Sequence, residues 1–227
     1  MKKILLTFLL VLLIPSGMEA QRRNGLISRR GNSNGSITFS TGPAYCFGDP
    51  FGSPYEKSFI NGTNWEAALG FSQMFQKTFG YRATLHYGNY SGTDGNVPKP
   101  HSGYYSFRSN VFEFTARGEY AYFFGRRYAR STPNSVRGFL GLGVLDNNAS
   151  FPAGMRIGKT TPTFAVLIPY GIAYQYDIRN SNFSFGAELG WQYVFSDYVD
   201  GYKPPFPSSK SNDVLANFKA TVTYKIF

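Results

Sequence analysis

Apolar and polar residues alternate along most of the chain, in about eight separate segments that follow its first 20 residues. In residues 183–195, for example, Phe183, Phe185, Leu189, Trp191 and Tyr193 are separated by mainly small or polar residues. A period of two indicates β-strands with two different faces, here one apolar and aromatic and the other polar. In lipid, such strands satisfy their backbone amides by closing into a barrel.

We therefore predict an all-β fold, an eight-stranded antiparallel transmembrane β-barrel over residues 36–227. The expected strands are 37–47, 64–74, 79–90, 105–124, 136–144, 164–176, 183–195 and 216–227. The expected connections alternate in length, because 48–63, 91–104, 145–163 and 196–215 are long whereas 75–78, 125–135 and 177–182 are shorter. Long outer loops and short inner turns are typical of a barrel whose two termini lie in the periplasm.

The first 20 residues predict export from the cytoplasm. Lys2 and Lys3 precede an apolar stretch over residues 4–14, and Ala20 ends a plausible cleavage site. This pattern is typical of a secretory signal peptide. Since no later run of about 18 apolar residues follows, the exported protein is either a soluble secreted protein or an outer-membrane barrel, and the alternation favours the barrel. We therefore expect a multi-pass protein of the Gram-negative outer membrane, with residues 21–35 forming a basic periplasmic arm.

The polar face of the expected strands carries charges of both signs. The inward-phase residues are Glu66, Arg82, His86, Glu113, Arg117, Glu119, Glu188 and Lys219. The interior of an eight-stranded barrel has just enough room for its own side chains. We therefore predict an ion-pair network that fills the lumen; the alternative is a proton or solute path.

Candidate chemistry is sparse elsewhere in the sequence. The single cysteine, Cys46, and two histidines form no cluster with metal-ligand spacing, and the glycine-rich stretch 138–143 lacks the lysine of a phosphate-binding loop. A hydrolase would have to combine His101 with partners such as Asp94 or Asp197 from other expected loops. We predict no catalytic site, no metal, no cofactor and no nucleic-acid partner.

Basic residues gather at the predicted periplasmic end. Removing residues 1–20 takes away Lys2, Lys3 and Glu19, leaving 21 Lys and Arg against 12 Asp and Glu, a net charge of +9. The arginines of the arm and of the second short turn are Arg22, Arg23, Arg29, Arg30, Arg126, Arg127 and Arg130. A cluster of one sign favours an acidic partner; the alternative is solvation and contact with anionic groups.

Several short motifs occur in the order and spacing of a known family. They are residues 45–49 (Tyr-Cys-Phe-Gly-Asp), 82–88 followed by Asp94, 107–109 followed by Glu113 and Glu119, and 195–200 (Phe-Ser-Asp-Tyr-Val-Asp). Over residues 36–227 the chain resembles the PorG-like outer-membrane barrels of the type IX secretion system. The resemblance implies a non-enzymatic barrel that associates with the periplasmic ring of PorK and PorN. Our hypothesis is that this barrel tethers or positions that ring. The competing hypothesis is a free-standing barrel of the OmpA or OmpX kind, acting in envelope integrity or adhesion through its outer loops.

Overall fold

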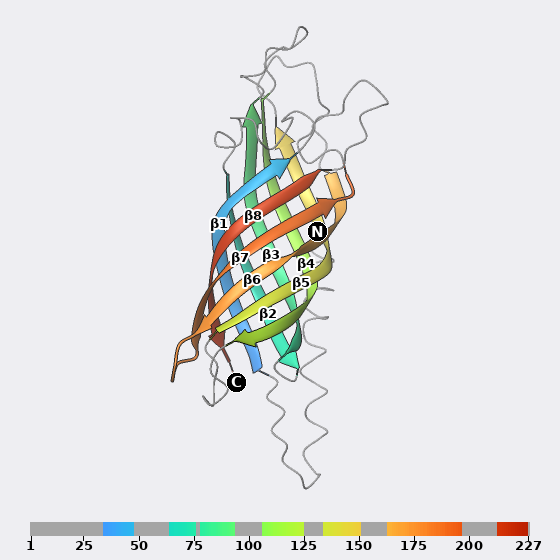
Figure 1. The fold of residues 1–227 in the computed structure, drawn as a ribbon. Coiled ribbons are helices and arrows are strands. Elements are labelled where there is room, and N and C mark those ends of the chain that lie inside the picture. Colours follow the sequence, from blue (N-terminus) through green and yellow to red (C-terminus); the bar gives the residue numbers. More distant parts are fainter. Residues whose placement is uncertain are drawn as a thin grey trace. The chain divides into compact units, whose positions relative to one another are not determined.

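The described part of the chain forms one closed, antiparallel β-barrel. A computed structural model describes residues 34–47, 64–75, 78–93, 106–124, 134–150, 163–196 and 213–226. The strands are β1 (Asn34–Phe47), β2 (Asn64–Phe75), β3 (Phe79–Thr93), β4 (Ser106–Phe124), β5 (Asn134–Ser150), β6 (Thr163–Asp177), β7 (Phe183–Val194) and β8 (Val214–Lys225). Each strand pairs with the next, and β1 pairs with β8 (Figure 1). The predicted eight-stranded barrel is confirmed.

The two ends of the barrel differ in the connections that they carry. We call the end at which β1 begins and β8 ends the terminal end; residues 76–78, 125–133 and 178–182 connect strands there. We call the other end the long-loop end, where residues 48–63, 94–105, 151–162 and 197–212 connect strands. No helix in the described residues is long and apolar enough to cross a membrane.

Strand β5 is the main departure from the predicted boundaries. It was expected to end at residue 144 but continues to Ser150, so the prediction that the loop 145–163 begins at residue 145 was wrong. The extension pairs with the first part of β4, from Glu113↔Leu145 to Arg108↔Ser150. The long neighbouring strand supplies the hydrogen bonds that hold residues 146–150 in a strand, although their polar sequence shows no apolar alternation. The other strand ends lie within three residues of the predicted ones.

The outward face of the barrel is apolar. On β2, Trp65 and Leu69 are exposed, whereas the alternating Glu66, Ala68 and Ser72 are buried. The same alternation exposes Phe112, Tyr120 and Tyr122 on β4 and Phe218, Val222 and Tyr224 on β8. A continuous apolar belt of this kind suits contact with lipid rather than water.

Glycine and proline shape the seam between the first and last strands. A Cβ atom at Gly42 would collide with the backbone carbonyl of Phe218, so glycine permits the close approach of β1 to β8. Pro43 follows, and the β1–β8 register skips from Thr41↔Ala220 to Ala44↔Asn217. Proline has no amide proton to donate to the ladder. The pairing of β1 with β8 beside Lys219 therefore depends on the residue pairs on either side of Gly42 and Pro43.

Candidate functional site: the barrel interior

The middle of the lumen holds a network of charged side chains. All eight residues predicted for the lumen point inward, and none is more than 5% exposed. Alternation places them there, because every second residue of a strand points to the same face. They come from β2, β3, β4, β7 and β8, so the network joins strands on different sides of the barrel.

Glu119 is the carboxylate with the most arginine partners. Its Oε1 lies 2.8 Å from Arg82 Nε and accepts a hydrogen bond from Arg117 Nε at 3.1 Å. Its Oε2 accepts from Arg82 Nη2 and from Arg137 Nη1, both at 3.3 Å. Three guanidinium groups from three neighbouring strands therefore share one carboxylate.

Arg137 was missing from the predicted network, although it is 8% exposed and bonds Glu119 directly. The signal was present in the sequence, because Arg137 lies between the outward positions Val136 and Gly138 and so falls on the inward phase of β5. Phe139, two residues further on, also points inward, and the Arg117 guanidinium carbon lies 3.9 Å from the centre of its ring. A cation over an aromatic face adds a further favourable contact for Arg117.

Arg117 also forms a forked ion pair across the lumen. Its Nη1 donates to Glu188 Oε1 at 2.9 Å, and its Nη2 donates to Glu188 Oε2. Lys219 Nζ lies 3.4 Å from Glu188 Oε1 and 3.1 Å from Glu66 Oε1. Lys219 thus links the arginine cluster to a second cluster centred on Glu66.

The second cluster contains the buried histidine. His86 Nδ1 lies 2.5 Å from Glu66 Oε1, and its Nε2 lies 3.2 Å from Thr115 Oγ1. Glu113 accepts a hydrogen bond from Gln192 at 3.0 Å and lies 3.8 Å from His86 Nε2. In total, the network combines four buried carboxylates with five buried basic side chains. The carboxylates are Glu66, Glu113, Glu119 and Glu188, and the basic side chains are Arg82, Arg117, Arg137, Lys219 and His86.

The network specifies which face of the strands points inward. A slip of one residue in register would turn every side chain of a strand to the opposite face. Each Arg or Lys turned to the lipid would then cost about 2–4 kcal/mol at mid-membrane. Buried ion pairs contribute little net stability compared with apolar packing, so specifying the inward face is the clearer physical role of these charges.

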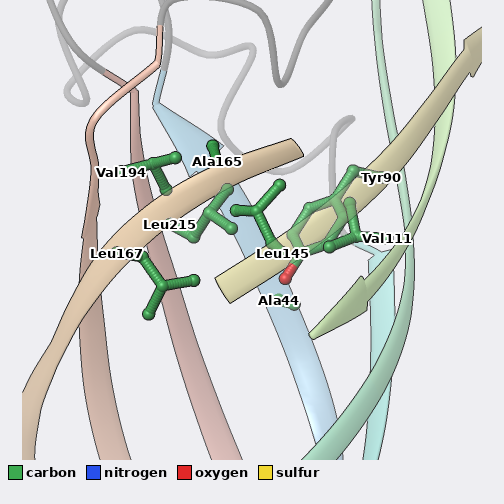
Figure 2. Packing of buried hydrophobic residues seen from close by; sticks show 8 residues of the cluster. All are labelled: Ala44, Tyr90, Val111, Leu145, Ala165, Leu167, Val194 and Leu215. Atoms are coloured by element: carbon green, nitrogen blue, oxygen red, sulfur yellow. The ribbon is translucent and has the colours of Figure 1, made fainter. Parts of the chain in front are cut away.

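A cluster of apolar side chains fills the lumen next to the long-loop end. Its members are Ala44, Tyr90, Val111, Leu145, Ala165, Leu167, Val194 and Leu215, which point toward one another from β1, β3, β4, β5, β6, β7 and β8 (Figure 2). The Tyr90 hydroxyl donates to Glu66 Oε2 at 3.3 Å, which joins this apolar cluster to the charged network. Cys46 packs against the cluster.

Hydroxyl groups line the lumen toward the terminal end. Ser36 and Ser72 share a hydrogen bond of 2.8 Å, and Thr38 and Thr223 share one of 2.9 Å. All four side chains are buried. The interior is thus layered along its axis, with an apolar cluster, a charged network and a hydroxyl layer.

In the described strands, little free space is found among the side chains of the network. Two cavities among its side chains, one beside Arg82 and one beside Gln192, offer at most about 10 Å³. A water molecule needs roughly 10–15 Å³. Within the described strands, the geometry therefore favours a filled interior over the solute path that was the alternative.

The remaining predicted positions fall outside the described residues. They are the arm arginines Arg22, Arg23, Arg29 and Arg30, the turn arginines Arg126, Arg127 and Arg130, and the loop residues Asp94, His101 and Asp197. Within the described strands, no group of three or more His, Cys, Asp or Glu side chains is arranged to hold a metal ion.

A closed barrel of eight strands with an apolar belt and a filled polar interior is the architecture of a small outer-membrane β-barrel. No protein-family model matches the sequence. No curated protein matches it either.

Similar solved structures include three barrels. Neisserial surface protein A shares 15% identity at a TM-score of 0.47, over 85% of this chain and 97% of that one. Ail, the attachment invasion locus protein of Yersinia pestis, shares 13% at 0.47, over 86% of this chain and 99% of its own. A major outer membrane protein from Thermus thermophilus shares 11% at 0.48, over 85% and 99% of the two chains.

Proposed function

We propose that the protein is a non-enzymatic component of a type IX secretion system in a Gram-negative outer membrane, where it tethers or positions the periplasmic PorK/PorN ring. The filled interior supports a role as an anchor rather than as a channel, since charged and apolar side chains occupy the lumen of the described strands. The protein would then act through the segments that connect its strands. The family resemblance of residues 36–227 suggests which partner these segments bind.

The observation that carries the proposal is the unequal charge of the two ends. The segments joined to the terminal end, 21–33, 76–78, 125–133 and 178–182, hold nine Lys or Arg and no Asp or Glu. Those joined to the long-loop end, 48–63, 94–105, 151–162 and 197–212, hold six Lys or Arg and five Asp or Glu. Such one-sided charge favours an acidic partner at the terminal end.

The strand register supports placing the second turn at this end. The pair Phe124↔Asn134 closes the β4–β5 ladder at the terminal end, so residues 125–133 leave and re-enter the barrel there. Arg126, Arg127 and Arg130 lie in this connection. β1, which follows the arginines of residues 22–30 in the sequence, begins at the same end. Lys225 is already paired at this rim, since its Nζ lies 2.7 Å from Asp177 Oδ2.

A charge-reversal experiment tests the proposal. Arg126, Arg127 and Arg130 are replaced together by Glu, and intact cells are crosslinked before mild detergent extraction. We expect the ring proteins to co-purify with the wild-type barrel and to be lost from this variant, together with secretion. The matched control reverses Arg156, Lys159 and Lys203 at the long-loop end, which makes the same change in net charge.

The control should keep both the ring proteins and secretion. Ring association that survives reversal of Arg126, Arg127 and Arg130 would mean that the contact has been assigned to the wrong residues. A wild-type barrel that brings down no ring proteins would instead support the free-standing barrel acting through its outer loops.

A further inference from the structure

A hollow of about 670 Å³ opens on the outer surface of the barrel. Its lining includes the aromatic side chains of Phe79, Tyr120, Tyr170 and Trp191, and glycines at positions 118 and 138. We infer that this hollow binds one acyl chain of a phospholipid from the membrane leaflet at the terminal end.

The hollow exists because two outward positions carry no side chain. The pairs Gly118↔Leu140 and Tyr120↔Gly138 make the two glycines diagonal neighbours on β4 and β5. Other outward positions of these strands hold large side chains, such as Tyr122 and Leu142. The glycines therefore leave a gap in an otherwise continuous apolar belt.

The packing of the barrel itself does not require glycine at these two positions. A Cβ atom added at Gly138 would meet nothing within 4 Å, and one added at Gly118 would come no closer than 3.9 Å to another atom. At Gly141 on the same strand, by contrast, a Cβ atom would collide with the carbonyl of Ala116. The open space at 118 and 138 is thus a property of the outer surface and is unrelated to strand pairing.

The position of the hollow fits a phospholipid of one leaflet. Phe79 is the first residue of β3 at the terminal end, whereas Tyr170 is the central residue of β6. The hollow therefore runs from the rim toward the middle of the barrel, which is the course of an acyl chain whose headgroup stays at the rim. Tyr170 and Trp191 stack with ring centres 6.1 Å apart and form one wall.

Continuity with the apolar belt identifies the occupant. The outward residues around the hollow, such as Leu140 and Ile172, are exposed members of the face that contacts lipid. An acyl chain is apolar along its length and can follow a groove that runs from rim to middle. A small surface hollow with aromatic walls would hold such a chain longer than the flat parts of the belt do.

Native mass spectrometry of the full-length barrel, extracted from membranes in mild detergent, tests the inference. We expect one phospholipid to remain on each wild-type barrel and to be lost from Gly138→Leu, whose side chain fills the hollow. The matched control is Ala220→Leu, which places the same side chain at an exposed outward position of β8. The control should keep its phospholipid, and both variants should show the wild-type heat-dependent shift in gel mobility that reports a folded barrel.

A wild-type barrel without phospholipid, or a Gly138→Leu barrel that keeps as much as the wild type, would overturn the inference. A second measurement uses intact membranes, with a photoreactive benzoylphenylalanine in place of Tyr120 or, as control, of Phe218 on β8. We expect a phospholipid adduct in higher yield from position 120. Equal yields, or a crosslink from position 120 to a second copy or another protein, would show that an acyl chain is not the resident occupant.

Discussion

Replacing Glu119 by Gln should destabilise the barrel strongly. The carboxylate lies 1% exposed and contacts Arg82 at 2.8 Å, Arg117 at 3.1 Å and Arg137 at 3.3 Å. Glutamine has nearly the same shape but no charge, and its amide group would point two hydrogens at guanidinium groups that are themselves donors. Removing one member of a buried ion pair costs about 3–5 kcal/mol. Since three arginines lose their shared partner, we expect a loss at the upper part of that range.

The assay is equilibrium unfolding by urea in phospholipid vesicles, followed by tryptophan fluorescence, because Trp65 and Trp191 lie on the lipid side of the barrel wall. The control is Asp177→Asn, which makes the same chemical change at the rim. Asp177 and Lys225 are 33% and 29% exposed, so this ion pair is worth about 0–1 kcal/mol. A loss below about 1 kcal/mol for Glu119→Gln would refute the reasoning that burial makes the arginines depend on this carboxylate.

Two further predictions concern the apolar parts of the barrel and use the same unfolding assay. Leu145→Ala should cost about 2–5 kcal/mol, because Leu145 is 1% exposed inside the apolar cluster of the lumen; Leu142→Ala, on the outward face, should cost less, and equal losses would mean that the cluster is not tightly packed. Leu142→Arg should cost about 2–4 kcal/mol if position 142 lies at mid-membrane, against about 0–1 kcal/mol for Asn148→Arg near the end of the same strand. A larger loss for Asn148→Arg would show that the membrane contacts a different level of β5.

The strand pattern could be predicted from the sequence because one repeating signal, the alternation of faces, acts along the whole barrel. The eight charges predicted for the lumen follow from the same phase, and all point inward in the structure. Pairing was beyond reach, because it depends on register between strands. That Glu119 meets Arg137 follows from the placement of β4 beside β5, which alternation alone does not fix.

The apolar cluster in the lumen could not be predicted by the same reasoning. Leu145, Leu167 and Leu215 point inward. When the alternation is interpreted with a polar interior, every leucine is instead expected on the lipid side. They are tolerated inside because, at the long-loop end, they meet one another and not the charged network. The C-terminal part of β5 was missed for a related reason, since its polar residues form a strand because β4 pairs with them and β6 pairs with Asp146 and Asn147.

The layering of the lumen has a consequence for how the protein responds to its medium. Dissolved ions weaken the attraction between charges that they can approach, over a distance of about 10 Å at 0.1 M salt. Here the apolar cluster separates the charged network from the long-loop end, and the buried Ser36–Ser72 and Thr38–Thr223 pairs lie on its other side. Because the ion pairs are buried, dissolved ions screen them much less than pairs at the surface. The stability of the barrel should therefore change little between low and high ionic strength.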